Sequence, residues 1–376
     1  MPEPFKNFFN IPLIEKMAGL IEASDPNFNA KRFISLASAN FEALELKERS
    51  NQIKDSLVAT LSNDVSVSGL ILVSTLGGEA SVDGGTTDAS DDPGMRGFAI
   101  MPMADFIAEI GINEPQQSFD VLEEMTKRFS AEFAVRPFII NDPKGAMERF
   151  AKWAKSENAH VRRLASEGCR PLLPWGLRLQ DFVKDPAPIL PILEELKDDP
   201  TEYVRRSVAN NINDIAKNQP DLVAEIAAKW LKGASKNRER LVRHACRTLI
   251  KKGHKPTLKA LGYDDLNADL VSFSLENDQI KLGEAVNFSF ALKPTTNTTQ
   301  PIILDYAIHF KKANGSTAPK VFKLKTGSLA AGETLQIEKS HIIKKITTMV
   351  FYEGEHQLEL LANGKSLGSL PFHLSL

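Results

Sequence analysis

The chain has 376 residues, of which 42% are hydrophobic and 25% are charged, and this composition excludes a globally disordered protein. A chain of this length is expected to form two or three domains. The net charge is −2, yet residues 127–255 hold 26 lysines and arginines against 16 aspartates and glutamates. This basic block favours a polyanionic partner, with nucleic acid the leading candidate, although solvated helix surfaces would give the same count.

The sequence lacks the patterns of several protein classes. Its apolar runs fall short of the ~20 residues that a membrane-spanning helix needs, so we expect no membrane contact. The N-terminal residues do not resemble a signal peptide, which predicts a cytoplasmic protein. Cys169 and Cys246 are too few for a disulfide framework, and the seven histidines show no paired ligand spacing. We therefore expect no metal site, and the glycines of residues 77–97 do not match a phosphate-binding loop.

The first 76 residues are predicted to be helical because their apolar residues recur at helical spacing. This spacing is clearest at Phe33, Leu36, Ala37, Phe41 and Leu44. Residues 77–97 are rich in Gly, Asp, Ser and Thr, which predicts a mobile loop.

An internal repeat follows in the residues after this loop. Its copies can be aligned on Val161, Val204 and Val242, each followed by Arg-Arg or Arg-His, and a weaker copy lies at 126–132. Another amphipathic stretch precedes each of the three strong copies, at 145–156, 188–197 and 220–232. Helix pairs with a period near ~40 residues are typical of HEAT-like solenoids, which stack into a curved superhelix. We therefore predict a HEAT-like α-solenoid domain over residues 1–264.

The repeats carry charged residues on the side opposite their apolar face. Basic or polar residues follow at fixed offsets from the alignment valine: Arg128, Arg163, Arg206, Asn210 and His244. Arg170, Arg247 and Lys251 extend this basic character, which suits a phosphate backbone. Three carboxylates stand among these residues, Glu132, Glu167 and Asp214. They either form salt bridges with the neighbouring arginines or take part in chemistry, and their position alone leaves both readings open.

Trp175 follows two prolines, Pro171 and Pro174, at the predicted end of a helix. Its ring either completes the core, as tryptophan usually does, or offers its face to a base or a cationic group.

From residue 267 onward the apolar pattern changes to a period of two. Alternating segments begin at Val271, Val286, Tyr306 and Leu358. Asn-Gly pairs at 314–315 and 363–364 are typical of tight hairpin turns. About seven short strands over residues 267–376 predict an all-β immunoglobulin-like sandwich. The fold class is thus mainly α, with a helical-repeat solenoid followed by a β-sandwich.

Several blocks of the sequence resemble one protein family. Residues 164–176, 202–217 and 238–253 are similar to the AlkC branch of the HEAT-like bacterial DNA alkylation repair glycosylases, and the tail resembles the immunoglobulin-like domain of that branch. The resemblance extends over the whole chain. It departs locally at Leu172, where a basic residue is expected between the two prolines.

This resemblance implies a monofunctional DNA glycosylase that removes cationic N3-alkylated bases, 3-methyladenine and 3-methylcytosine, from double-stranded DNA. Glu132, Glu167 and Asp214 match acidic active-site positions, and Trp175 matches an aromatic position beside the lesion. The arginines and the other basic or polar residues named above would hold the DNA backbone. The resemblance implies no cofactor, and we expect a monomer without an obligate protein partner. The competing hypothesis is a non-enzymatic repeat scaffold that binds nucleic acid or an acidic protein.

Overall fold

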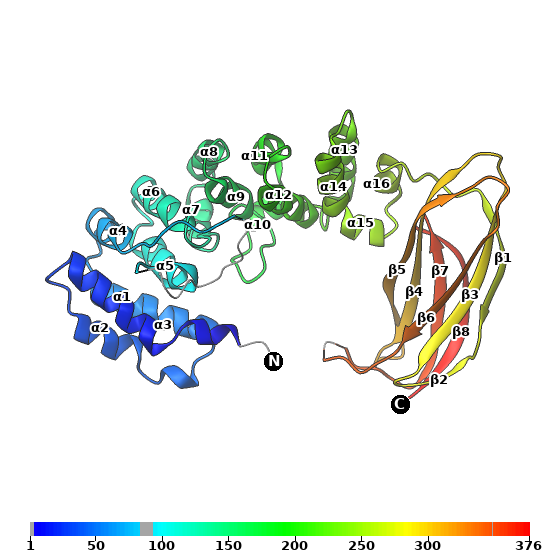
Figure 1. The fold of residues 1–376 in the computed structure, drawn as a ribbon, viewed down its shortest axis with the longest axis horizontal. Coiled ribbons are helices and arrows are strands. Elements are labelled where there is room, and N and C mark those ends of the chain that lie inside the picture. Colours follow the sequence, from blue (N-terminus) through cyan, green and yellow to red (C-terminus); the bar gives the residue numbers. More distant parts are fainter. Residues whose placement is uncertain (1–3, 83–92, 348) are drawn as a thin grey trace. The chain divides into compact units, whose positions relative to one another are not determined.

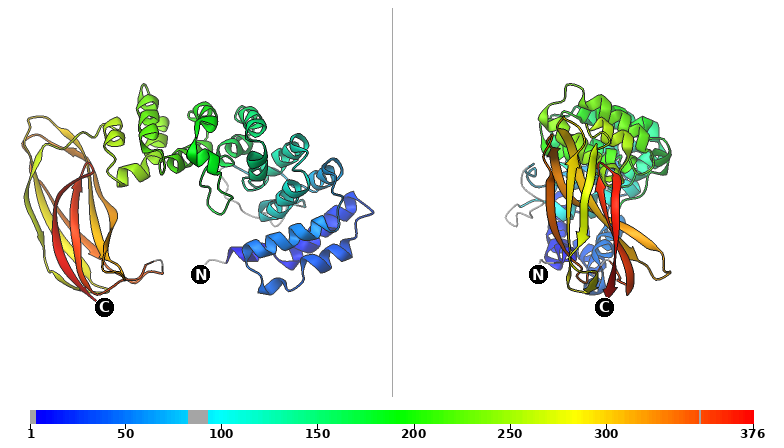
Figure 2. Two further views of the ribbon diagram at one scale, coloured as in Figure 1. Left: turned by 180° about the vertical axis from the view of Figure 1, so that it is seen from behind. Right: turned by 90° about the vertical axis from the view of Figure 1, so that its right-hand side faces the viewer.

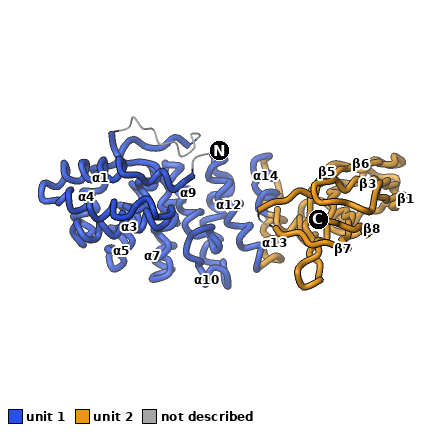
Figure 3. The backbone as a smooth tube through the Cα atoms, turned by 90° about the horizontal axis from the view of Figure 1, so that it is seen from below, with its two compact units in different colours: residues 1–218, 236–245 blue, residues 219–235, 246–376 orange. Residues whose placement is uncertain are grey.

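A computed structural model describes residues 4–82, 93–347 and 349–376. The chain divides into two compact units, Met1–Asn218 with Lys236–Ala245, and Gln219–Ser235 with Cys246–Leu376 (Figure 3). Helices make up the chain as far as Ala260, and strands begin at Ala268 (Figure 1). The predicted order of a helical-repeat part followed by a β part is confirmed, while the domain boundary between residues 264 and 267 stays a prediction.

The helices of the first unit are α1 (Ile11–Ser24), α2 (Ala30–Ala37), α3 (Leu46–Val58), α4 (Val65–Ser74), α5 (Ile100–Ile110), α6 (Pro115–Thr126), α7 (Arg136–Asn141), α8 (Pro143–Trp153), α9 (Ala159–Glu167), α10 (Gln180–Lys184), α11 (Leu190–Leu196), α12 (Glu202–Ile215) and α14 (Lys236–Ala245). Within this unit α6, α8 and α11 form one row, and α9, α12 and α14 form a second row packed against it (Figures 1 and 2). The described part of the chain contains no helix long and apolar enough to cross a membrane.

Helix α9 illustrates how the sequence builds one repeat. The side chain of Asn158 accepts hydrogen bonds from the backbone N–H groups of His160 and Val161, which caps the helix start. Val161, Leu164 and Ala165 are fully buried, so the predicted apolar face packs as expected. The corresponding valines of α12 and α14 are buried as well. Because this apolar face packs against the neighbouring helices, the charged residues lie on the opposite side of each helix.

The weaker repeat copy at 126–132 does not form a helix of this kind, and that prediction is wrong. Helix α6 ends at Thr126, and residues 127–135 form the turn that leads into α7. The backbone N–H groups of Arg128 and Phe129 both bond the carbonyl of Met125, which closes the helix. Arg128 and Glu132 therefore lie in a turn between helices.

The predicted mobile loop at 77–97 falls partly outside the described residues, because 83–92 are not among them. Its two described ends lie side by side. The N–H of Gly77 bonds the carbonyl of Met95 at 2.9 Å, and the N–H of Met95 bonds the carbonyl of Thr75 at 2.7 Å. The N–H of Ala80 bonds the carbonyl of Lys127 at 2.8 Å, which fixes this end beside the turn after α6.

The second unit combines three helices with a β-sandwich. Its elements are α13 (Pro220–Leu231), α15 (Arg247–Lys251), α16 (Lys255–Ala260), β1 (Ala268–Leu275), β2 (Gln279–Lys281), β3 (Ala285–Pro294), β4 (Gln300–Lys311), β5 (Thr317–Leu329), β6 (Leu335–Ile342), β7 (Gly354–Ala362) and β8 (Lys365–Ser375). The strand order is β1-β3-β6 in one sheet and β2-β8-β7-β4-β5 in the other. Strand β2 pairs with β8 in parallel, and the other pairs are antiparallel.

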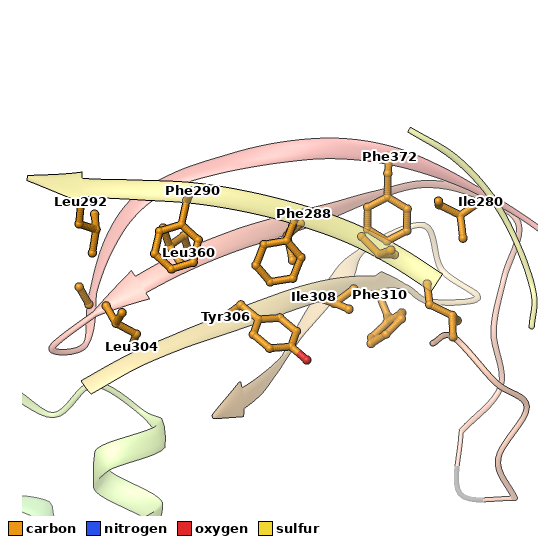
Figure 4. Packing of buried hydrophobic residues seen from close by; sticks show 14 of the residues in the cluster. Ile280, Phe288, Phe290, Leu292, Leu304, Tyr306, Ile308, Phe310, Leu360 and Phe372 are labelled. Atoms are coloured by element: carbon orange, nitrogen blue, oxygen red, sulfur yellow. The ribbon is translucent and has the colours of Figure 1, made fainter. Parts of the chain in front are cut away.

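Alternate residues of the strands form the core of the sandwich. Phe288 and Phe290 of β3 pack between the sheets together with Tyr306 of β4, Leu360 of β7 and Phe372 of β8 (Figure 4). A smaller cluster of Leu258, Tyr263 and Ile303 packs α16 against β4 within the same unit. The predicted period-two pattern thus corresponds to the inward face of β3, β4 and β7. It is wrong at Val271 of β1, which is 59% exposed, because the pairing of β1 with β3 shifts register between Leu270 and Ser272.

Candidate active site

A cleft of about 640 Å³ opens in the first unit among α3, α5, α9, α12 and the turns beside them. Six of the residues singled out from the sequence line it: Arg128, Glu132, Arg163, Glu167, Arg170 and Trp175. The turn before α7 supplies Glu132, and the end of α9 supplies Glu167. The structure therefore brings together charged and aromatic groups that stand far apart in the chain.

Glu132 lies at the wall of the cleft, and its side chain is 15% exposed. Its Oε2 accepts hydrogen bonds from Arg163 at 2.9 Å and from the hydroxyl of Ser130 at 2.8 Å. Arg163 also bonds the Ser130 hydroxyl at 3.0 Å and lies over the ring of Tyr203, with 5.1 Å from the guanidinium carbon to the ring centre. The hydrogen bonds to Glu132 from described residues thus fall on Oε2, and none of them falls on Oε1.

Glu167 is buried, and its two oxygens have separate partners. Oε1 accepts from Arg170 at 2.6 Å and lies 3.7 Å from Arg163, while Oε2 accepts from the hydroxyl of Ser207 at 2.6 Å. Burial by itself would raise the pKa of this carboxyl, but the charges of Arg163 and Arg170 and the hydrogen bonds from Ser207 and Arg170 outweigh it. The pKa of Glu167 is therefore held below its ordinary value, and the group is ionised at neutral pH.

Asp214 joins the site through Arg170. The Nε of Arg170 bonds Oδ2 of Asp214 at 2.9 Å, and Lys217 bonds Oδ1 at 3.0 Å. Arg170 is itself 7% exposed, with its guanidinium held between Glu167 and Asp214. We predicted that Arg170 contacts a DNA phosphate. Its placement instead favours a role in holding the two carboxylates. Asp214 does not line the cleft, and its contact with the lining residues runs through this arginine.

Trp175 lies on the rim of the cleft with 65% of its surface exposed, so the core reading of this residue is wrong. Its φ of 65° is in the left-handed region, which non-glycine residues rarely adopt. The fully buried Arg136 anchors the loop that presents it. Its guanidinium bonds the backbone carbonyls of Gly168 at 2.8 Å, Arg170 at 2.9 Å and Leu177 at 2.5 Å. Burial lowers the pKa of Arg136 to about 10.

The sequence reasoning missed two ring residues that line the cleft, His160 and Tyr203. The Nδ1 of His160 lies 3.4 Å from the Tyr203 hydroxyl, and its Nε2 lies 2.9 Å from the carbonyl of Ala80. Both residues stand immediately before an alignment valine, Val161 or Val204. The repeat register could have revealed them, because they occupy the same position in successive copies.

The remaining predicted phosphate contacts lie outside this cleft. Arg206 and His244 line a second groove of about 210 Å³ between α12 and α14, and Asn210 lies 3.2 Å from the His244 ring nitrogen. Arg247 and Lys251 belong to α15 in the second compact unit. Within the residues that the structure describes, no group of three His, Cys, Asp or Glu side chains could hold a metal ion.

Comparisons with known proteins identify relatives for both the helical part and the β part of the chain. Residues 116–252 match the DNA alkylation repair enzyme family, and residues 269–376 match the family described as the C-terminal Ig-like domain of the uncharacterised protein YhaZ. YhaZ of Bacillus subtilis is 34% identical over 371 residues, which cover 98% of this chain and 99% of YhaZ.

Among solved structures, the alkylpurine DNA glycosylase AlkC of Pseudomonas fluorescens, bound to DNA that contains an abasic site analog, is 33% identical. The alignment covers 100% of both chains with a TM-score of 0.86. Similarity of this extent includes both the helical repeats and the β-sandwich. The chain therefore belongs to the AlkC-type family of DNA alkylation repair glycosylases.

Proposed function

We propose that this protein is a monofunctional DNA glycosylase that hydrolyses the N-glycosidic bond of cationic N3-alkylated bases, 3-methyladenine and 3-methylcytosine, in double-stranded DNA. This reaction is the first step of base excision repair. The observation that carries the proposal is the ionised, buried carboxylate of Glu167 in the same cleft as Glu132 and the exposed ring of Trp175.

The chemistry of an N3-alkylated base suits this set of groups. The alkyl group gives the base a positive charge, so the base leaves without prior protonation. The sugar that remains has oxocarbenium character, as in glycoside hydrolysis. A fixed negative charge near this sugar stabilises the transition state. A strong general acid is therefore unnecessary, and the site contains two carboxylates paired with arginines, of which Glu167 has its pKa held below the ordinary value.

We assign different roles to Glu167 and Glu132 because their hydrogen bonds differ. Both oxygens of Glu167 are bonded to protein groups, so this residue supplies fixed negative charge. The bonds from described residues to Glu132 fall on Oε2, so Oε1 is open to orient the attacking water and accept its proton. Asp214 holds Arg170 and thereby the orientation of Glu167.

Trp175 and the exposed arginines bind the substrate. The indole face of Trp175 contacts the cationic base, an interaction worth ~1–2 kcal/mol when water is excluded. Arg206 is exposed at the second groove beside His244, and these side chains hold phosphates of the DNA backbone. The free energy of binding then comes from contacts with the DNA backbone, and the selectivity for alkylated bases comes from the positive charge of the base.

Single-turnover release of base from methylated duplex DNA tests this function. We expect the wild-type protein to release 3-methyladenine or 3-methylcytosine, and Glu167→Gln to lower the rate ~100-fold or more, as removal of a preorganised electrostatic group does. Affinity for the same DNA should stay within ~3-fold of wild type. Glu148→Gln, an exposed substitution on α8, is the matched control and should release base at the wild-type rate.

The same experiment separates the enzyme from the scaffold hypothesis. A wild-type protein that binds methylated DNA but releases no base would overturn the catalytic assignment and leave a repeat scaffold as the explanation. Release that survives in Glu167→Gln would show that this carboxylate does not take part.

A further inference from the structure

The backbone of Trp175 is held by contacts from three directions. The N–H of Gly176 bonds the carbonyl of Leu173 at 3.2 Å, which closes a turn around Trp175. Arg136 bonds the carbonyls on both sides of this turn, at Arg170 and Leu177. The third contact is a hydrogen bond of 2.6 Å from the Nζ of Lys47 to the carbonyl oxygen of Trp175 itself. Because a left-handed tryptophan is unfavourable by itself, such contacts decide where its ring stands.

Lys47 comes from a distant part of the chain. It lies in the first turn of α3, 128 residues before Trp175, and both Leu46 and Lys47 line the cleft. This segment lies outside residues 116–252, which match the alkylation repair family, and its sequence carries no motif of its own. The N-terminal helices therefore contribute directly to the cleft wall.

The ammonium group of Lys47 donates to the Trp175 carbonyl, and its charge also acts on the buried carboxyl of Asp105 on α5, where it partly offsets the rise in pKa that burial causes. Among the described residues, no carboxylate lies within ion-pair distance of its Nζ, and the carbonyl of Trp175 is its hydrogen-bond acceptor. A charged donor makes a stronger bond to a carbonyl than a neutral donor does. The contact thus joins the start of α3 to the rim loop after α9 at one defined atom.

We propose that Lys47 is a positioning residue that fixes the carbonyl of Trp175 and thereby the orientation of its indole ring toward the alkylated base. This inference rests on the proposed glycosylase function. The N-terminal helices then form part of the active site, since they hold the residue that contacts the lesion.

The test uses the full-length protein and three variants. Lys47→Met removes the donor while it keeps an unbranched apolar stem, Lys47→Arg retains a charged donor, and Lys152→Met is the control for loss of one exposed lysine on α8. Two properties are measured for each protein: single-turnover base release from methylated duplex DNA, and acrylamide quenching of tryptophan fluorescence. Trp153 and Trp230 are 2% and 3% exposed, so the quenchable signal comes from Trp175.

We expect Lys47→Met to release base ~10-fold more slowly, which is the loss of one charge-assisted hydrogen bond expressed as a rate. Acrylamide should quench its Trp175 fluorescence more readily, because the ring moves more freely. Lys47→Arg should recover at least half of the lost rate, and Lys152→Met should match wild type in both measurements.

Release by Lys47→Met within twofold of wild type, or an unchanged Trp175 signal, would overturn the positioning role. These outcomes are distinct from failure of the proposed function, in which the wild-type protein itself releases no base. If Lys47→Met and Lys47→Arg lose rate equally while the tryptophan signal stays that of wild type, the lysine does not act through Trp175 and the inference fails.

Discussion

Five charged side chains in and beside the cleft form an alternating series. Glu132 bonds Arg163, Arg163 approaches Glu167, Glu167 bonds Arg170, and Arg170 bonds Asp214. Buried charges are tolerated when each has a partner of opposite sign, and removal of one partner leaves the other uncompensated. The two readings of these carboxylates that the sequence left open are therefore compatible. The salt bridges exist, and they place the carboxylates where the proposed chemistry needs negative charge.

The pKa of Glu167 predicts how stability depends on pH. Its pKa in the folded protein lies below the ordinary value of 4.5, so the folded state binds this proton less readily than the unfolded state. Glu167 therefore contributes stability above about pH 4.5, and this contribution is lost as the pH falls through and below that value. We expect Glu167→Gln to lower the free energy of unfolding by ~1–3 kcal/mol near neutral pH, since the amide replaces a charged acceptor.

Urea denaturation followed at about pH 7 and about pH 3 would measure this difference. The gap between wild type and Glu167→Gln should narrow at the lower pH, because the carboxyl is then protonated in the unfolded chain and the folded state loses part of its advantage. Glu148→Gln should show no gap at either pH. A gap of constant size would show that the Glu167 carboxylate is not linked to folding through its proton.

At the residue scale, the repeat register predicted the cleft from the sequence in large part. Offsets from Val161 located Arg163 and Glu167, and both lie in the cleft. Lys47 could not be found in this way, because its contact with Trp175 depends on tertiary structure and joins segments with no shared pattern. The burial of Arg170 could not be predicted either. The residue type alone does not distinguish an arginine that contacts a phosphate from one that pairs with a buried carboxylate.

At the element scale, the turn between β7 and β8 shows how local sequence and packing agree. Asn363 and Gly364 have φ values of 45° and 74°, as the predicted tight turn requires. The side chain of Asn363 bonds the carbonyls of Asp264 and Pro301, and Gly364 packs closely against Gly253. The hairpin therefore closes the sandwich and also contacts the segment before α16 within the same unit.

This packing predicts a difference between two glycines of similar conformation. A Cβ on Gly364 would lie 2.5 Å from the Cα of Gly253, whereas a Cβ on Gly315, with φ of 78°, would meet nothing within 4 Å. Gly315→Ala should cost ~1 kcal/mol, for the backbone conformation alone. Gly364→Ala should cost ~2–4 kcal/mol, because overpacking adds to the same strain. Thermal or urea unfolding of both variants measures the difference, and equal losses would show that the contact with Gly253 relaxes freely.

The elements themselves could be predicted where a period was sustained. The helices on Val161 and Val204 and the hairpins at both Asn-Gly pairs follow the patterns of the sequence. The copy at 126–132 failed because its charged residues matched the repeat while its backbone did not continue the helix. The bonds that close α6 at Met125 form in the folded chain and leave no periodic signal.

At the scale of the whole molecule, the basic block overstates the charge available to a polyanion. Many of its arginines and lysines are paired with carboxylates in the folded protein, among them Arg149 with Asp120 and Glu123, Arg162 with Asp199, and Arg238 with Asp198. By contrast, Arg206 and Arg240 line the second groove, and no described residue forms an ion pair with either. The number of lysines and arginines in residues 127–255 therefore includes two groups. One group is paired with carboxylates of the protein, and the other can bind phosphates.

Salt dependence of DNA binding separates these populations. Each cation that neutralises a phosphate displaces condensed counterions, so the logarithm of the association constant falls with the logarithm of the salt concentration by ~0.9 for every contact. Arg206→Gln and Arg240→Gln should each weaken binding to any duplex and reduce this slope by ~1. Lys197→Gln, which removes a lysine already paired with Glu194 at 2.8 Å, is the matched control and should leave the slope unchanged. Equal slopes for all four proteins, measured by anisotropy of a labelled duplex over a salt series, would contradict phosphate contacts at this groove. The basic character of residues 127–255 would then be a property of internal ion pairing, and affinity for DNA would have to arise from the other basic residues of the chain.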